Sequence, residues 1–293
     1  MAEINIDPVF NQIVLVPTDF SDVCRNAIFH AVKLARRTGF KIYILYIITK
    51  ETRTMLNQLH VREEYVDWKL NEYKKYYEKK YGVCITTMAV KGSILSTIHD
   101  VAEQIRADVM ILGTHGKKGL QHVFGSYARR ILLQFTIPVI VVQKIAYREI
   151  YRNIVLPVHD PAASSDAIHW AFLMARMFDA KFHIFSRPAS NASMKDLLAV
   201  IIRNVRSVFD EGHMPDIVIT PNKSPDFARE VISYSLARHA DMIMIINYPD
   251  ISAESFSLTT WNEKLMFNEA QIPVIFINPE FLSKRNFKSI TIT

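Results

Sequence analysis

Short apolar runs alternate with longer amphipathic stretches along the first half of the chain. The runs are apolar on both faces, a pattern typical of strands buried in a parallel sheet. They predict strands near residues 12–18, 41–48, 84–90, 108–113 and 137–143. The stretches between them predict helices near residues 21–38, 53–81, 93–106 and 126–135. This alternation predicts an α/β fold, with right-handed crossovers and a doubly wound parallel sheet.

Capping signals mark the ends of two predicted helices. Residues 19–22 (DFSD) supply N-cap candidates for the first helix, and Gly39 is its C-cap candidate. Gly92 and Ser93 open the third helix in the same manner. These signals place helix starts directly after strands, at the carboxyl edge of the predicted sheet.

The whole pattern occurs twice, in the same order, at an offset of about 140 residues that shrinks by a few towards the end. The matching segments are 13–19 with 154–160, 27–36 with 167–176, 41–44 with 181–184, 107–112 with 240–245, and 137–142 with 272–277. A repeat this long indicates duplication of a whole domain, not a solenoid. We therefore predict two tandem domains, residues 1–146 and 147–293, each with a five-stranded parallel sheet.

Composition narrows the class of protein. With 49% apolar and 22% charged residues, each half can bury a core of its own. The sequence shows no leader pattern and no apolar run near 18 residues, so we expect a soluble, cytoplasmic protein that does not bind membranes. Cys24 and Cys84 form no CxxC motif, which argues against a disulfide framework or a zinc site.

Positive charge gathers in the first half of the chain. The net charge is +6; residues 1–146 hold 20 Lys and Arg against 13 Asp and Glu, whereas residues 147–293 hold 15 against 16. An excess of positive charge suits a phosphate-bearing ligand in the first domain.

Four glycines crowd into thirteen residues of that domain: Gly113, Gly116, Gly119 and Gly125. They follow an apolar run and precede a predicted helix. A strand, a glycine-rich turn and a helix can hold phosphate, because glycine admits close backbone approach and a helix start offers unpaired N–H groups. Asp19 also follows a strand, so both motifs are expected at one crevice, where the strand order reverses.

The first domain resembles a universal stress protein domain. The resemblance rests on residues 16–21 (VPTDFS), residues 108–116 (DVMILGTHG), Gly125-Ser126 and residues 137–142 (IPVIVV). It covers residues 10–145 and, more faintly, 150–278. It implies a Rossmann-like domain that dimerises and, in one branch of the family, binds ATP through a G-x2-G-x9-G-[ST] turn. The spacer between Gly116 and Gly125 here is eight residues, one shorter than that pattern.

The resemblance also implies roles for particular residues around the adenosine. Asp19 would accept hydrogen bonds from the ribose hydroxyls, and Pro17 and Thr18 would shape the adenosine wall. Ile47, at the end of the second strand, would offer its backbone to adenine.

The same resemblance implies a phosphate cradle. Gly113, Gly116 and Gly125 would let the chain wrap the phosphates, so a Gly113→Val variant is expected to fold yet lose nucleotide. The implied N–H donors are His115, Ser126 and Tyr127, and the Ser126 hydroxyl would donate as well. Mg²⁺ would arrive only with the phosphates. No catalytic residue and no metal site of the protein's own is assigned.

The second domain lacks this chemistry. Residues 246–260 contain no glycine, and Pro249, Asp250 and Glu254 stand where backbone would approach phosphate. Asp160 is retained, but an aspartate after a strand is readily explained as a helix cap. We predict a degenerate domain that binds no nucleotide in this mode. The resemblance implies that the last strands of the two domains pair inside one chain as a pseudo-twofold dimer, and could also support a further homodimer.

Three functions follow from these features. The leading one is a stress-response or regulatory protein that binds ATP, or ADP or AMP, in its first domain. The alternatives are a ligand-free dimerisation or interaction scaffold and a slow ATPase, although no general base or carboxylate pair for two metals is evident.

Residues 69–80 interleave basic and aromatic side chains, which could indicate nucleic acid, but Glu72, Glu78 and the helical spacing favour an amphipathic helix.

Overall fold

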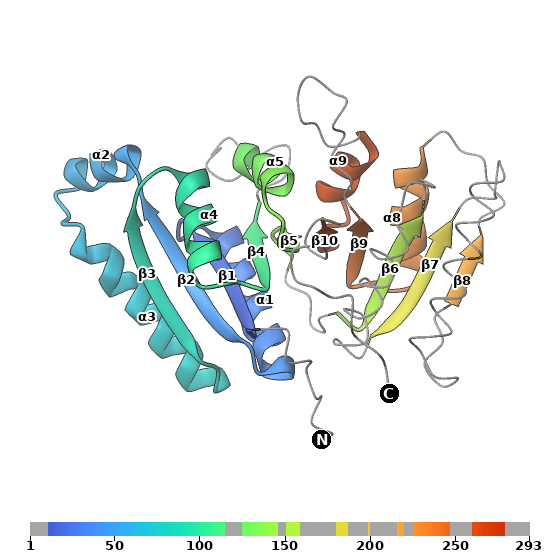
Figure 1. Ribbon diagram of the computed structural model, residues 1–293, viewed down its shortest axis with the longest axis horizontal. Helices are drawn as coiled ribbons and strands as arrows, with labels where there is room; N and C mark the ends of the chain where they lie inside the picture. The colour runs from blue at the N-terminus through green and yellow to red at the C-terminus, as the bar shows by residue number, and fades with distance from the viewer. Residues whose placement is uncertain are drawn as a thin grey trace. The chain divides into compact units, whose positions relative to one another are not determined.

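The computed structural model divides into two compact units, Met1–Ala146 and Tyr147–Thr293 (Figure 1). The described residues are 11–114, 125–145, 151–158, 180–186, 199, 216–219, 226–246 and 260–278. Each unit is built on its own set of parallel strands, which confirms the predicted α/β class.

In the first unit, β1 is the central strand. The strands are β1 (Ile13–Thr18), β2 (Lys41–Ile48), β3 (Ile85–Lys91), β4 (Val109–Gly113) and β5 (Val139–Val142). They pair in parallel in the order β3-β2-β1-β4-β5. Val14, Leu15 and Val16 of β1 are fully buried. Runs that are apolar on both faces therefore form the middle of a sheet covered by helices on both sides.

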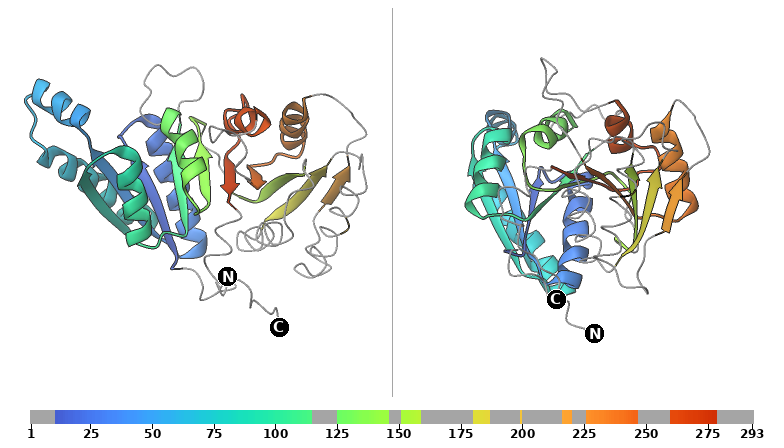
Figure 2. Two further views of the ribbon diagram at one scale, coloured as in Figure 1. Left: turned by 45° about the horizontal axis from the view of Figure 1, so that its top comes forward. Right: turned by 45° about the vertical axis from the view of Figure 1, so that its right-hand side comes forward.

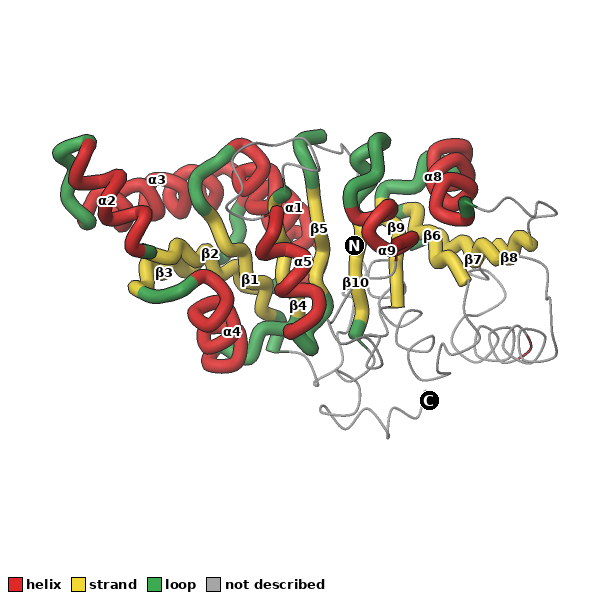
Figure 3. The backbone as a smooth tube through the Cα atoms, turned by 90° about the horizontal axis from the view of Figure 1, so that it is seen from above, coloured by secondary structure: helices red, strands yellow, loops and turns green. Residues whose placement is uncertain are grey.

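Helices cover both faces of this sheet. They are α1 (Asp22–Thr38), α2 (Lys50–Gln58), α3 (Glu64–Tyr81), α4 (Ile94–Gln104) and α5 (Gly125–Gln134). Helices α1 and α3 lie on one face, and α4 and α5 lie on the other (Figure 3). The faces change where the strand order reverses, between β1 and β4, as in other doubly wound sheets.

The single helix predicted for residues 53–81 is wrong, because the chain turns between α2 and α3. His60 takes a left-handed φ of 53°, and the Val61 N–H bonds to the Leu56 carbonyl at 2.9 Å. A left-handed residue cannot continue a right-handed helix. Helix α2 consequently lies beyond the β3 edge of the first unit's sheet (Figure 2).

The predicted caps of α1 are confirmed. Ser21 is its N-cap and accepts a hydrogen bond from the Cys24 N–H at 3.4 Å. Gly39 ends the helix at a left-handed φ of 76°, and its N–H bonds to the Ala35 carbonyl at 2.7 Å. Ser93 is the N-cap of α4, but its Oγ bonds to the Ser96 Oγ at 2.6 Å instead of capping the first turn.

The second unit has the same strand order as the first. Its strands are β6 (Asn153–Val158), β7 (Lys181–Ser186), β8 (Asp216–Ile219), β9 (Met242–Ile246) and β10 (Val274–Ile277). They pair in parallel in the order β10-β9-β6-β7-β8. Helices α8 (Phe227–Ala237) and α9 (Thr260–Met266) pack against each other. In the part of the chain that the structure describes, no helix of either unit could cross a membrane.

One buried aspartate ties the base of the central strand in each unit. In the first unit, the Asp108 carboxylate accepts hydrogen bonds from the N–H groups of Asn11, at 3.2 Å, and Ile13, at 2.8 Å. In the second unit, the Asp241 carboxylate accepts them from the N–H groups of Arg152, at 2.8 Å, and Asn153, at 3.2 Å. The two aspartates are 2% and 6% exposed. Each carboxylate fixes two backbone donors that the start of a strand would otherwise leave without a partner.

Candidate functional site

The candidate site lies at the carboxyl ends of β1 and β4. These two strands are neighbours, with Val14 in register with Val109, and the helices that follow them lie on opposite faces of the sheet (Figure 3). Open α/β sheets bind ligands at this switch point. Asp19 follows β1 there and is half-buried.

Side chains hold the turn from β1 into α1 through backbone N–H groups. The Phe20 N–H donates to Thr18 Oγ1 at 3.1 Å, and the Ser21 N–H donates to Asp19 Oδ1 at 2.8 Å. A carboxylate can accept several hydrogen bonds on its two oxygens. Asp19 therefore combines a fixed position with capacity to accept further donors.

The charge of Asp19 acts on two side chains beside it. Burial, reinforced by Asp19, raises the pKa of the Cys24 thiol to about 12. Burial also raises the pKa of Tyr46, and the Asp19 charge adds to that increase, while a hydrogen bond with Thr52 opposes it. Cys24 remains a protonated thiol near neutral pH, so it is poorly suited to act as a nucleophile.

Gly113 is required by packing, independently of any ligand. A Cβ added there would lie 2.5 Å from the Val23 carbonyl oxygen and 2.8 Å from the Cys24 amide nitrogen. These are backbone atoms of the first turn of α1, so they cannot yield as a flexible side chain would. The Gly113→Val variant, expected to fold and to lose nucleotide, should therefore lose stability as well. The close approach brings the start of α1 against the end of β4.

The structure brings together part of the predicted site. Pro17 and Thr18 are buried at the end of β1. Ile47 is 5% exposed and in register with Val90, but β2 continues to Ile48, so Ile47 does not end the strand as predicted.

The phosphate side of the predicted site is only partly within the described residues. Gly125, Ser126 and Tyr127 form the first turn of α5. His115 and Gly116 lie outside the described residues, as do Asp160 and residues 247–259 of the second unit.

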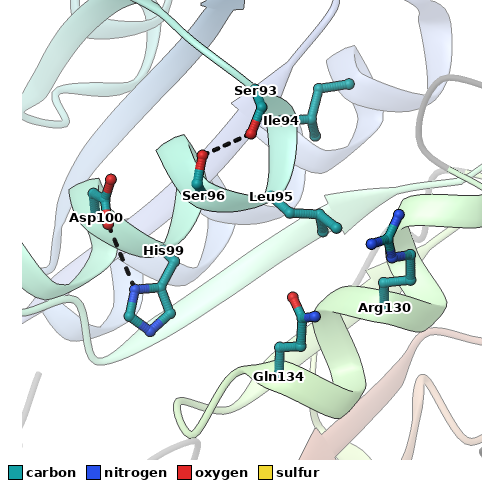
Figure 4. Close-up of a pocket in the computed structure, with 8 residues that line it drawn as sticks. All are labelled: Ser93, Ile94, Leu95, Ser96, His99, Asp100, Arg130 and Gln134. Atoms are coloured by element: carbon teal, nitrogen blue, oxygen red, sulfur yellow. Dashed lines mark hydrogen bonds and ion pairs between the residues drawn. The ribbon is translucent and has the colours of Figure 1, made fainter. Parts of the chain in front are cut away.

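A groove between α4 and α5 gathers further polar side chains (Figure 4). Its lining residues are Ser93, Ile94, Leu95, Ser96, His99, Asp100, Arg130 and Gln134. The two serine hydroxyls bond to each other, while His99 Nδ1 lies 3.8 Å from Asp100 Oδ1. Among these lining residues, therefore, no serine is hydrogen-bonded to the imidazole, as an activated nucleophile would require.

Sequence reasoning missed the residues that surround Asp19. Phe20 stacks on Tyr46 with ring centroids 4.6 Å apart, and Lys69 Nζ lies 4.4 Å from the Phe20 ring centroid. The only sequence feature that bears on the contact between Lys69 and Phe20 is the spacing of basic and aromatic residues over 69–80. It predicts a helix but does not indicate which ring the helix covers.

Comparisons with known proteins agree with this architecture. The model of the universal stress protein family matches residues 11–143. The chain is 31% identical over 141 residues to universal stress protein MJ0531 of Methanocaldococcus jannaschii, covering 45% of this chain and 81% of that protein.

Solved structures resemble the chain along almost its whole length. The crystal structure of a universal stress protein from Archaeoglobus fulgidus matches with a TM-score of 0.69 at 16% identity, covering 92% of this chain and 99% of that one. A functionally unknown protein from Pseudomonas aeruginosa matches with a TM-score of 0.62 at 14% identity, covering 94% and 95% of the two chains. At these identities the structures support the fold alone. The family model and the archaeal relative, of which the chain covers 81% at 31% identity, show that the chain belongs to the universal stress protein family.

Proposed function

We propose that the first unit binds ATP, or a related adenine nucleotide, at the carboxyl ends of β1 and β4, and that the protein acts as a nucleotide-dependent regulator in the stress response. One observation carries the proposal. Asp19 lies at the switch point of the strand order, half-buried, with its carboxylate fixed by the Ser21 N–H at 2.8 Å. Ribose offers two hydroxyl donors, which a fixed carboxylate is well suited to accept.

The neighbouring elements suit the rest of a nucleotide. Ile47, near the end of β2, would offer its backbone to adenine on the β2 side of the crevice. On the β4 side, the first turn of α5 begins at Gly125 and offers N–H groups and a positive helix end to phosphates. Gly116 and His115 would complete the cradle, and Mg²⁺ would come bound to the phosphates.

A ligand-free scaffold is the second candidate, and one observation favours it. Gly113 has a packing reason of its own, since its missing side chain leaves room for the backbone of Val23 and Cys24. The glycine therefore does not by itself point to phosphate.

The nucleotide content of the purified full-length chain separates the two candidates. Protein purified without added nucleotide is denatured, and the released small molecules are identified and quantified by chromatography. We expect about one adenine nucleotide per chain, because only the first domain carries the glycine-rich turn. Protein that is empty and also gives no heat on titration with Mg-ATP would overturn the proposal and leave the scaffold.

Turnover is measured in the same preparation. Because no general base has been identified, we expect ATP to remain intact over many minutes of incubation with Mg²⁺. Phosphate release that requires Mg²⁺ and is abolished by Asp19→Asn would instead favour the slow ATPase.

A further inference from the structure

Phe20 has a backbone conformation that bulky residues rarely adopt. Its φ of 66° lies in the left-handed region, where the Cβ of an L-residue crowds its own backbone. Such strain persists only where the surroundings enforce it, and it is concentrated at functional sites. Phe20 directly follows Asp19, so the strained residue adjoins the carboxylate proposed to bind ribose.

Three side chains from two elements hold the Phe20 ring. Tyr46 of β2 stacks on it at 4.6 Å with an interplanar angle of 24°. Tyr73 of α3 meets it edge-on at 5.7 Å and 88°, and Lys69 of α3 places its Nζ 4.4 Å from the ring centroid. Aromatic pairs and cation–π contacts of this kind favour one orientation of the ring. We call this group, Phe20 with Tyr46, Lys69 and Tyr73, the Phe20 clamp.

The clamp acts on Asp19 through the backbone. The Phe20 N–H is bonded to Thr18 Oγ1, and the next N–H, that of Ser21, is the donor that holds Asp19 Oδ1. Fixing Phe20 between these two peptide groups fixes the direction of the Ser21 N–H. Without the clamp, Phe20 would be free to leave the left-handed region, and the hydrogen bond to the carboxylate would lose its geometry.

We propose that Phe20 is a positioning residue: the clamp keeps Asp19 in the one orientation in which its carboxylate distinguishes nucleotides with ribose hydroxyls from nucleotides without them. The inference rests on the proposed function. Hydrogen-bonding sites discriminate strongly against ligands that lack the matching hydroxyl, but only if their polar groups are held in place. A helix far along the chain, α3, thereby contributes to specificity without touching the ligand.

A purely structural role for Phe20 predicts something different. It would lower stability, or weaken all nucleotides equally. The positioning role changes a ratio, namely the affinity for ATP divided by the affinity for 2′,3′-dideoxy-ATP. That ratio is insensitive to the fraction of folded protein.

The experiment measures this ratio by calorimetric titration of the full chain with each nucleotide and Mg²⁺. We expect wild type to prefer ATP by about a hundredfold, as for the loss of two hydrogen bonds to a charged group. Phe20→Gly accepts the left-handed backbone but removes the ring, and its ratio should fall towards one. Phe20→Tyr keeps the ring and should keep the ratio. Lys69→Met should lower the ratio, whereas Lys75→Met, a matched change of a 78% exposed lysine on the same helix, should not.

An Asp19→Asn background tests whether Phe20 acts through Asp19. In that background, Phe20→Gly should leave the ratio unchanged, because the carboxylate it positions is gone. A ratio that stays at the wild-type value in Phe20→Gly or in Lys69→Met would overturn the positioning role, even with ATP bound normally. A wild-type ratio of one would overturn the role of Asp19 but not nucleotide binding. Absence of binding by wild type would overturn the proposed function itself.

Discussion

The two units are more alike at the amino ends of their central strands, the base, than at the carboxyl ends of their strands, the rim. At the base, Asp108 and Asp241 each accept hydrogen bonds from N–H groups at the start of the central strand of their unit. The residues two positions earlier, Arg106 and His239, have left-handed φ values of 51° and 52°. At the rim, Gly113 is in register with Val142, whereas the second unit has Ile246 in register with Ile277.

This contrast separates a base that both units keep from a rim whose residues differ. The base is held by buried backbone donors, which would remain unsatisfied if the aspartate were lost. The rim is constrained by packing instead: Gly113 leaves room for the backbone of Val23 and Cys24, whereas the second unit holds a partly exposed isoleucine, Ile246, at the matching position. The two units therefore share one strand order and differ in the residues at the rim, where sites are carried by folds.

Acid should destabilise the first unit through a buried histidine, and this effect should be the largest. Burial lowers the pKa of His30, on α1, to about 3, while the repeat places Trp170 at the same position. The unfolded chain binds a proton near pH 6.5 and the folded unit does not, so stability present above that pH is lost as the pH falls towards 3. The loss reaches about 4 kcal/mol.

Hydrogen exchange resolved by peptide, from pH 7 to pH 4, measures this loss in each unit. His30→Leu is the matched control, and the wild-type minus variant difference isolates the histidine from the carboxylates. A wild-type curve for the first unit that parallels the His30→Leu curve would contradict the prediction.

Gly113→Val should destabilise the first unit by about 3 kcal/mol, since overpacking against rigid neighbours costs this much or more. The clash with the Val23 carbonyl, at 2.5 Å, cannot be relieved by a rotamer change. Ile246→Val places the same residue, valine, at the corresponding position of the second unit. It should cost only about 1 kcal/mol of stability. Urea unfolding monitored separately for each unit by hydrogen exchange gives both values. Equal costs would mean that the rims do not differ in packing.

The base aspartates should behave alike in the two units. Asp108→Ala and Asp241→Ala each leave two backbone donors without their carboxylate, so each should cost its own unit about 2 kcal/mol. The same unfolding experiment measures both. A loss confined to one unit would show that the base, too, has diverged.

The sequence predicts the strands well because their signal is local. The first two predicted strands agree with β1 and β2 to within one residue, since most residues of these apolar runs are buried. The sequence also predicts the C-cap at Gly39, because glycine is favoured at a helix end that takes the left-handed conformation.

Features set by distant contacts were not predictable. The break between α2 and α3 has no glycine or proline to mark it; the left-handed residue is His60. The packing reason for Gly113 depends on Val23, 90 positions earlier in the chain, and the strain at Phe20 depends on rings from β2 and α3. The motif identified Asp19, but only the fold reveals what holds it.

The smallest and most specific test compares the two aspartates that follow the first strand of each domain. Asp19→Asn keeps the shape of the side chain and removes the charge, so nucleotide affinity should fall about tenfold, or about 1.4 kcal/mol. Asp160→Asn, in the domain without the glycine-rich turn, should leave affinity and stoichiometry unchanged. Calorimetric titration with Mg-ATP measures both. If Asp160→Asn weakened binding, the second domain would hold nucleotide despite its rim. The difference between the units would then lie in how phosphate is held, and not in whether a nucleotide is bound.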